Sequence, residues 1–218
     1  MADGVSDAFT DIDPARVRAN LDRVRERIAA AGGDPAVVEV CAAVKYVPAR
    51  ELPALAEGGI ELVGENRAQD LLAKQADHGP LFKWDFFGAL QSRKVRDVAP
   101  AVRLIHSVAS DSALAQLAKH PAREVLVQVN VAGEQGKAGI VPEGLGDFIE
   151  RCPVAVSGLM TMPPFAERPE DSRRHFARLA ELAAEHGLDR LSMGTTQDFE
   201  VAVAEGATIV RVGSALYE

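Results

Sequence analysis

The chain has 218 residues, a formal net charge of −8 and a hydrophobic share of 47%. This length suits one sizeable core, the apolar share argues against disorder, and the acidic balance argues against nucleic acid as the main partner. The N-terminal stretch lacks a basic region followed by an apolar run, and no apolar stretch approaches the ~20 residues that cross a membrane. We therefore expect a soluble, cytoplasmic protein that contacts no membrane.

The first predicted element is a helix over 14–31 that follows a flexible N-terminal tail at 1–12. Asp13 supplies an N-cap carboxylate, and Pro14 occupies the first helical position. Apolar residues follow at helical spacing, and Gly32 marks the end of the helix.

Short β-rich runs then alternate with helical stretches rich in Ala and Leu. We predict strands over 38–46, 60–66, 83–89, 103–108, 124–132, 154–162, 189–194 and 208–214. We predict helices between them over 49–57, 68–77, 92–102, 111–119, 143–151, 169–186 and 196–205.

This alternation predicts an α/β fold with a parallel sheet, and eight strands is the closure number of the TIM-type (β/α)8 barrel. We predict one such barrel as a single domain over 13–218, with the helix at 14–31 as an extra element. That helix could fill the place of the missing eighth helix, because the chain ends just after the last strand. An open doubly wound sheet is the competing architecture.

Polar residues and glycines gather at the C-terminal ends of nearly all the predicted strands. In a (β/α) barrel these ends surround the active site. The pattern therefore indicates a pocket there, without naming its ligand. Neither the two cysteines nor the five histidines show the spacing of metal ligands, so no metal site is expected. His106 is expected in the core or as a support beside the pocket.

Lys45 follows the apolar run 40–44, so it emerges from a buried strand at this predicted pocket. A partly desolvated amine can attack a carbonyl compound and form a Schiff base. A lysine that snorkels from a strand end to solvent would give the same pattern, so both interpretations stay open at this point.

Glycines and hydroxyl residues follow the last two predicted strands, at 192–196 and 211–214. Loops after strands 7 and 8 form a recurrent phosphate site in this fold, and a helix starting at 196 would add free backbone N–H groups. Ordinary turn chemistry explains either loop alone, whereas the pair on adjacent strands favours a phosphate cradle.

A lysine facing a phosphate cradle across a barrel mouth is the arrangement expected of a pyridoxal 5′-phosphate (PLP) site. Arg211 is the candidate neighbour of the pyridine nitrogen. A cation there disfavours protonating that nitrogen and weakens the electron sink, which predicts weak or no carbanion chemistry. A salt bridge inside the barrel is the alternative role of Arg211.

A series of short segments, in order over about residues 14 to 217, carries a family resemblance. They are Ala-Val-Lys at 43–45, Gly-Glu-Asn at 64–66, Phe-Gly-Ala-Leu-Gln-Ser-Arg-Lys at 87–94, Ile-His-Ser-Val at 105–108, Gln-Val-Asn-Val at 128–131, Gly-Lys-Ala-Gly at 136–139, Gly-Leu-Met-Thr-Met at 158–162, Leu-Ser-Met-Gly at 191–194, Asp-Phe-Glu at 198–200 and Glu-Gly-Ala-Thr-Ile-Val-Arg-Val-Gly-Ser at 205–214. Together they resemble the pyridoxal-phosphate homeostasis proteins, a family similar to the N-terminal barrel of alanine racemase.

The resemblance implies that Lys45 carries PLP as a Schiff base. It also implies the other cofactor-binding residues, with Ser192, Thr196, Gly213 and Ser214 around the phosphate and with Asn66, Met160 and Arg211 lining the pocket. The function implied is intracellular PLP homeostasis, in which a non-enzymatic carrier supplies or buffers PLP. Apo PLP-dependent enzymes are the implied recipients, and the absence of a dimerisation domain from the chain favours a monomer.

Three features depart from the family pattern. The family usually has a histidine where this chain has Asp85, which changes the local charge. Thr195 replaces an apolar residue, although Thr196 keeps a hydroxyl at the next position. The chain also ends at Glu218, slightly earlier than the family pattern, so the last strand is expected to have little cover.

A PLP-dependent amino-acid racemase, or a related PLP enzyme, is the main alternative function. Racemisation needs acid/base groups on both faces of the Schiff base. In alanine racemases a tyrosine from a separate β-domain of the partner subunit serves the second face. This chain shows no such domain, and its tyrosines are Tyr46, beside the lysine, and Tyr217 near the end.

Two further alternatives stay open. A barrel enzyme could form a Schiff base with a phosphorylated metabolite on Lys45. The charged residues at 167–190 could form a docking face, although charge pairs at helical spacing are typical of a solvated helix.

Overall fold

Eight parallel strands close into a barrel in which each strand pairs with the next in the chain and β8 pairs with β1. The computed structural model describes residues 9–218. The strands are β1 (Glu39–Ala43), β2 (Leu62–Glu65), β3 (Lys83–Phe86), β4 (Leu104–Val108), β5 (Val125–Gln128), β6 (Val156–Met160), β7 (Arg190–Thr195) and β8 (Ile209–Val212). The prediction of a closed TIM-type barrel is confirmed, and the open sheet is excluded.

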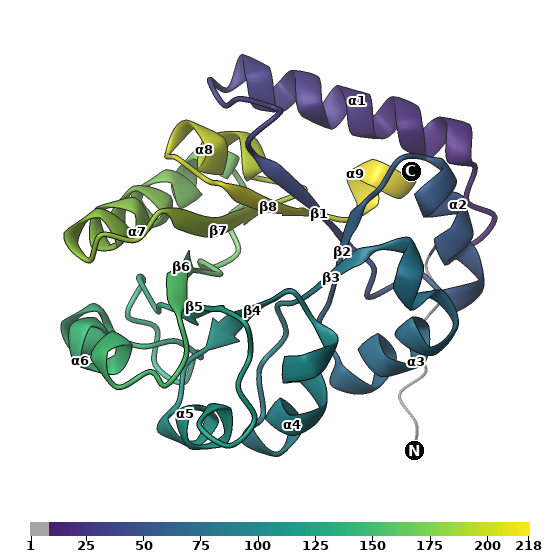
Figure 1. The fold of residues 1–218 in the computed structure, drawn as a ribbon. Coiled ribbons are helices and arrows are strands. Elements are labelled where there is room, and N and C mark those ends of the chain that lie inside the picture. The colour runs from purple at the N-terminus through teal and green to yellow at the C-terminus, as the bar shows by residue number, and fades with distance from the viewer. Residues whose placement is uncertain (1–8) are drawn as a thin grey trace.

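Helices surround the barrel on its outer side (Figure 1). They are α1 (Pro14–Ala30), α2 (Leu52–Glu57), α3 (Ala68–His78), α4 (Val95–Val98), α5 (Asp111–Leu117), α6 (Leu145–Glu150), α7 (Arg173–Glu185), α8 (Phe199–Ala204) and α9 (Ser214–Tyr217). Short 3-10 turns precede or follow several of them, and the predicted helix over 92–102 is α4 flanked by two such turns. Among residues 9–218 no helix has the length and apolarity needed to cross a membrane.

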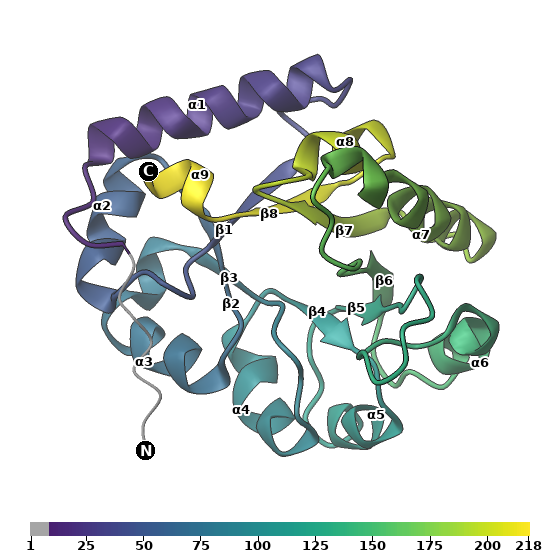
Figure 2. The same cartoon turned by 180° about the vertical axis from the view of Figure 1, so that it is seen from behind.

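Helix α1 covers the barrel where β8 meets β1, between α8 and α2 (Figures 1 and 2). Its start is as predicted, because the side chain of Asp13 accepts a hydrogen bond from the backbone N–H of Ala15 at 2.9 Å. Asn20 donates to the carbonyl oxygen of Leu216 at 3.1 Å and so ties α1 to α9. The predicted role of this helix in the outer ring is confirmed, and the short α9 adds cover beyond β8 that the sequence did not predict.

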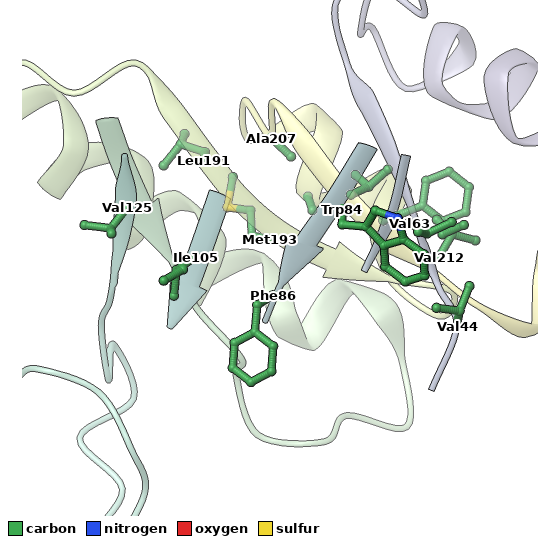
Figure 3. Packing of buried hydrophobic residues seen from close by; sticks show 14 of the residues in the cluster. Val44, Val63, Trp84, Phe86, Ile105, Val125, Leu191, Met193, Ala207 and Val212 are labelled. Atoms are coloured by element: carbon green, nitrogen blue, oxygen red, sulfur yellow. The ribbon is translucent and has the colours of Figure 1, made fainter. Parts of the chain in front are cut away.

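The hydrophobic core has an outer and an inner part. The outer part fills the space between strands and helices, and Figure 3 shows members from several strands, such as Trp84 and Phe86 of β3. The inner part lies inside the barrel and takes one residue from each of six strands: Cys41, Leu62, Leu104, Leu126, Met160 and Ile209.

The two remaining strands interrupt this inner ring with polar residues. Asp85 of β3 pairs in register with Leu104, and Ser192 of β7 pairs with Met160 and Ile209. Because successive side chains of a strand alternate between its faces, Asp85 points inward while Trp84 and Phe86 point outward. The barrel interior is therefore polar along one path and apolar around it.

At the last two strands, two boundaries differ from the sequence prediction in ways that matter for the site. Strand β7 extends to Thr195 and helix α8 begins only at Phe199, so residues 196–198 form a turn instead of the first turn of a helix. Ser214 begins α9 instead of ending β8. Both differences lie close to a single glycine, Gly194 in the first case and Gly213 in the second.

The predicted tail at 1–12 falls partly outside the described residues, which begin at residue 9. Within the described part, Phe9 packs edge-to-face against Tyr217 with ring centroids 5.1 Å apart. The backbone N–H of Ile12 donates to Glu51 at 3.1 Å, and the Ile12 side chain is buried. Residues 9–12 therefore lie against the barrel, close to the C-terminal helix α9.

Candidate functional site

A cavity of about 500 Å³ opens across the C-terminal ends of the strands. Its lining residues are Phe9, Ala43, Lys45, Tyr46, Asn66, Phe87, Gly88, Met162, Thr195, Thr196, Gln197, Arg211, Gly213 and Ser214. A larger hollow of about 730 Å³ lies beside α7, but charged surface residues such as Glu170 and Arg174 line it. We place the candidate site in the cavity at the barrel mouth, because that is where (β/α) barrels bind ligands.

Six of the eight residues predicted for the site line this one cavity: Lys45, Asn66, Thr196, Arg211, Gly213 and Ser214. Met160 and Ser192 do not line it, and both are buried below it in the barrel interior. The cavity thus gathers residues from the ends of β1, β2, β7 and β8 that the sequence separates widely.

Lys45 lies just beyond β1, at the rim of the cavity. The N–H of the preceding Val44 donates to the carbonyl oxygen of Gly64 at 3.1 Å, which fixes the backbone beside β2. The ammonium group of Lys45 lies 4.7 Å from the ring centroid of Tyr46, and both residues are exposed. Of the two interpretations left open by the sequence, the structure shows the lysine that reaches solvent from a strand end, since Lys45 lies beyond β1 at the open mouth.

A buried ion pair holds the backbone around Lys45 and Asn66. The side chain of Lys74, from α3, is paired with Glu65 and also donates to the carbonyl oxygen of Val44 at 2.6 Å. Glu65 in turn accepts from the N–H of Asn66 at 2.9 Å. One buried lysine thus joins the ends of β1 and β2, so the two segments that carry Lys45 and Asn66 keep a fixed separation.

Gly88 closes the side of the cavity next to Asn66. A Cβ atom at Gly88 would lie 1.8 Å from the carbonyl oxygen of Asn66, so only glycine fits there. The carbonyl oxygen of Gly88 accepts a hydrogen bond from the Ser107 hydroxyl at 2.5 Å. This close approach brings the ends of β2 and β3 together and directs the neighbouring Phe87 toward the cavity that it lines.

The loops after β7 and β8 are joined by a hydrogen bond between their own atoms. The N–H of Gly213 donates to the Thr196 hydroxyl oxygen at 3.0 Å. Thr195 makes a local turn, because its N–H and its hydroxyl both donate to Asp198, at 2.8 and 3.0 Å. Residue 196 does not begin a helix, since α8 begins at Phe199, so the loop does not offer the free N–H groups of a helix N-terminus at this position. The polar surface of these loops comes from a turn and from hydroxyl groups.

Arg211 lies at the base of the cavity with only 5% of its surface exposed. Its guanidinium donates to the Ser192 hydroxyl oxygen at 2.6 Å, to the carbonyl oxygen of Thr161 at 2.9 Å and to the sulfur of Met162 at 2.9 Å. Burial lowers the pKa of Arg211 to about 10, which leaves it a cation at neutral pH.

No carboxylate lies within 4.0 Å of Arg211 among residues 9–218. The salt bridge considered from the sequence is therefore not formed, and all three protein groups that Arg211 contacts are neutral. A buried cation with neutral partners favours an anionic or electron-rich ligand in the space beside it.

Sequence reasoning misplaced one methionine and missed one aromatic residue. Met160 belongs to the inner ring of the barrel, whereas Met162, two positions further toward the mouth, lines the cavity. The two-residue period of a strand was a usable signal for Met162. Phe9 also lines the cavity, and nothing in its polar surroundings marks it as a site residue.

No cluster of three or more His, Cys, Asp or Glu residues suited to a metal ion occurs in the part of the chain that the structure describes. A cavity across the strand ends, with a lysine at its rim and a buried cation at its base, defines a ligand-binding (β/α)8 barrel.

Comparison with known proteins identifies the family to which this barrel belongs. Residues 12–218 match the family model described as alanine racemase, N-terminal domain. The pyridoxal phosphate homeostasis protein of Aquifex aeolicus is 38% identical over 213 residues, covering 90% of this chain and 93% of that protein. The protein of the same name from Pseudomonas aeruginosa is 40% identical over 208 residues, covering 89% and 90%.

A solved structure agrees with these sequence relatives. PipY of Synechococcus elongatus with PLP bound has a TM-score of 0.74 and 31% identity, and the match covers 89% of this chain and 100% of PipY. The chain therefore belongs to the family of the alanine racemase N-terminal domain, and within it to the pyridoxal phosphate homeostasis proteins. The family resemblance seen in the sequence is confirmed.

Proposed function

We propose that this chain binds PLP in the cavity at the barrel mouth, as a Schiff base on Lys45, with residues 13–218 as the PLP-binding unit. It holds the cofactor and supplies or buffers it for PLP-dependent enzymes. The observation that carries the proposal is the single cavity that six of the expected residues share. The names of the relatives and the PLP bound in PipY support the same conclusion.

The residues of the cavity fit PLP. A cavity of about 500 Å³ lies within the usual range of roughly 300–1,000 Å³ for small-ligand sites. Thr196 and Ser214 present hydroxyl groups beside Gly213, which suits a phosphate. Lys45 presents the amine that an aldehyde requires, and the buried Arg211 supplies a cation where an electron-rich ring atom would lie.

The side chains favour holding the cofactor over chemical turnover. Bound PLP supplies an electron sink that depends on a protonated ring nitrogen. Arg211 remains a cation at neutral pH, and a cation at the ring nitrogen opposes its protonation. Tyr217 is buried, and its hydroxyl donates to the carbonyl oxygen of Ala43 at 3.2 Å, so it is not available as the acid/base group that racemisation requires.

The visible spectrum of the purified protein tests this proposal. On addition of PLP we expect an absorption band from the Schiff base in the wild type and in Lys119→Ala, whose lysine is exposed on the surface away from the cavity. The band should vanish in Lys45→Ala while the circular dichroism spectrum is unchanged. A wild type that gains no band, or a Lys45→Ala variant that keeps it, would refute the attachment site.

Transfer experiments test the carrier role. Loaded wild-type protein should restore activity to an apo PLP-dependent enzyme across a semi-permeable membrane, and it should racemise no amino acid in a sensitive turnover assay. Robust racemisation would favour the enzyme alternative. The recipient enzymes, the monomeric state and the cytoplasmic location remain predictions.

A further inference from the structure

A continuous line of hydrogen bonds runs through the barrel interior below the cavity. Arg211 of β8 donates to the Ser192 hydroxyl oxygen of β7 at 2.6 Å, and this oxygen lies 2.8 Å from Nδ1 of His106 on β4. Nε2 of His106 lies 3.1 Å from a carboxylate oxygen of Asp85 on β3. Asp85, His106 and Ser192 are fully buried.

An ionised Asp85 together with a neutral His106 sets the direction of each bond, because a carboxylate only accepts and a guanidinium only donates. A guanidinium only donates, so the Ser192 oxygen accepts from Arg211 and its own proton is free to reach Nδ1 of His106. His106 then carries its proton on Nε2 and donates it to Asp85. Arg103 holds Asp85 from the other side, through its Nε at 3.0 Å and its Nη2 at 2.7 Å.

The charges around this line favour the same arrangement. Burial lowers the pKa of His106, and the nearby Arg211 and Arg103 lower it further against the opposing effect of Asp85, so the ring is neutral at pH 7. Burial acts to raise the pKa of Asp85, but hydrogen bonds from His106 and Arg103 lower it overall, so the carboxylate is ionised. Burial also raises the pKa of the neighbouring Cys41 thiol, which stays neutral.

The same three residue types form nucleophilic triads in hydrolases, but the geometry here does not suit that role. Ser192 does not line the cavity, and Arg211 lies between its hydroxyl and the mouth. No substrate can reach the Ser192 oxygen, so the line of bonds must act through Arg211.

We propose that Asp85 is a positioning residue that acts through His106 and Ser192 to hold Arg211 as a fixed cation at the base of the cavity. In this way a carboxylate deep in the barrel fixes the position of the cation that faces the ligand at its mouth. The identity of that ligand as PLP rests on the proposed function, whereas the line of bonds does not depend on it.

The first test needs no PLP. Nitrogen-15 NMR of the imidazole rings in the unloaded protein reports which ring nitrogen of each histidine carries the proton. We expect His106 to carry it on Nε2, without titration between about pH 8 and about pH 6. The His106→Gln variant assigns the signal among the five histidines. A proton on Nδ1, or a doubly protonated ring across this range, would overturn the proposal.

The second test uses the loaded protein and compares Asp85→Asn with Asp77→Asn, which removes an exposed carboxylate from α3. Loss of the Asp85 charge disfavours cationic forms in the cavity, so the pH midpoint of the visible band should fall by about one unit. Asp77→Asn should leave it unchanged. Equal midpoints in the two variants, with both binding PLP, would overturn the role of Asp85 while the proposed function stands.

Ser192→Ala keeps the proposal testable if Asp85→Asn does not fold. It removes one acceptor of Arg211 without touching the pair of Asp85 and Arg103. We expect PLP to dissociate about tenfold faster, because one hydrogen bond to a charged group is lost. Unchanged dissociation would show that Arg211 is held without the line of bonds, against the proposal. If the wild type binds no PLP at all, the proposed function fails, and the NMR test still decides the line of bonds.

Discussion

Arginines at the two ends of the barrel have opposite kinds of partner. At the N-terminal ends of the strands, two arginines have carboxylate partners: Arg190 contacts Glu39 at 2.9 Å and Glu124 at 2.7 Å, and Arg103 contacts both Glu39 and Asp85. At the C-terminal ends, Arg211 is more deeply buried than either arginine, yet its protein contacts are neutral.

This difference indicates that the N-terminal ends of the strands, with Arg103 and Arg190, stabilise the fold, whereas the C-terminal ends, with Arg211, bind a ligand. Ion pairs with short, paired contacts offset the cost of removing charge from water. A buried cation without a carboxylate keeps that cost, and a ligand that brings negative charge or electron density can offset it. The fold thus places its uncompensated charge at the mouth, where the cavity lies.

The largest expected effect follows from breaking the compensated end. Arg103→Met leaves the buried Asp85 with only His106 and removes one partner of Glu39. Breaking a buried ion pair from one side typically costs about 3–5 kcal/mol of unfolding free energy. Urea denaturation at neutral pH measures the loss.

The matched control for Arg103 is Arg178→Met on α7, whose ion pairs with Glu181 and Glu185 lie on the exposed surface. Exposed pairs contribute only about 0–1 kcal/mol, so this variant should be nearly as stable as the wild type. Similar losses in the two variants would contradict the idea that the N-terminal ends of the strands form a compensated, stabilising network.

The histidine that connects the two ends should make stability depend on pH. Burial lowers the pKa of His106, so the unfolded chain binds a proton more readily than the folded one. This contribution is fully present above the unfolded pKa of about 6.5 and is lost as the pH falls through the lower, folded value. The slope reaches at most about 1.4 kcal/mol per pH unit.

Denaturation of the wild type and of His106→Gln at several pH values isolates this contribution. Their difference in unfolding free energy should shrink as the pH falls below about 6.5. His175→Gln is the control, because burial also lowers the pKa of His175 but this residue on α7 is only half-buried. A wild-type profile with the same slope as that of His106→Gln would show that His106 is not held neutral.

Local patterns in the sequence predicted the barrel and the position of its mouth, and the family resemblance implied most of the residues that line the mouth. The alternation of strands and helices predicts the fold. Lys45, Asn66 and Gly213 lie just after the ends of strands and line the cavity. The inner line of bonds depends instead on which inward residues meet across the barrel. Asp85 and Ser192 come from strands on different sides of the closed sheet, and only closure brings both to His106.

Local patterns also failed where tertiary contacts decide the outcome. Phe9 reaches the cavity because it packs on Tyr217, more than two hundred residues away. The sequence left open whether Lys45 is shielded or reaches solvent, and the strand ends at Ala43 and leaves the lysine at the open rim. A strand-end rule gives the correct region, but the depth of a side chain depends on the exact end of the strand.

A matching substitution at the binding end should have a smaller effect on stability. Arg211→Met removes a buried cation, which relieves its desolvation, but leaves Ser192 and the carbonyl oxygen of Thr161 without their donor. Because the two effects oppose each other, we expect the unfolding free energy of the unloaded protein to change by about 1 kcal/mol or less. PLP should bind at least about tenfold more weakly. A stability loss as large as that of Arg103→Met would remove the distinction between the two ends.

The smallest expected effect on the unfolding free energy comes from removing a single carboxylate from the ion-pair network of Arg103 and Arg190. Glu124→Gln removes one of the two carboxylates that Arg190 contacts, and Arg190 keeps Glu39 at 2.9 Å. The side chains of Arg190 and Glu124 are 25% and 26% exposed, so water screens the charges of this pair. We expect a loss of about 0.5 kcal/mol in urea denaturation, decreasing at high salt. A loss of several kcal/mol would instead mean that Arg190 needs both carboxylates, and that Glu39 alone does not compensate its charge.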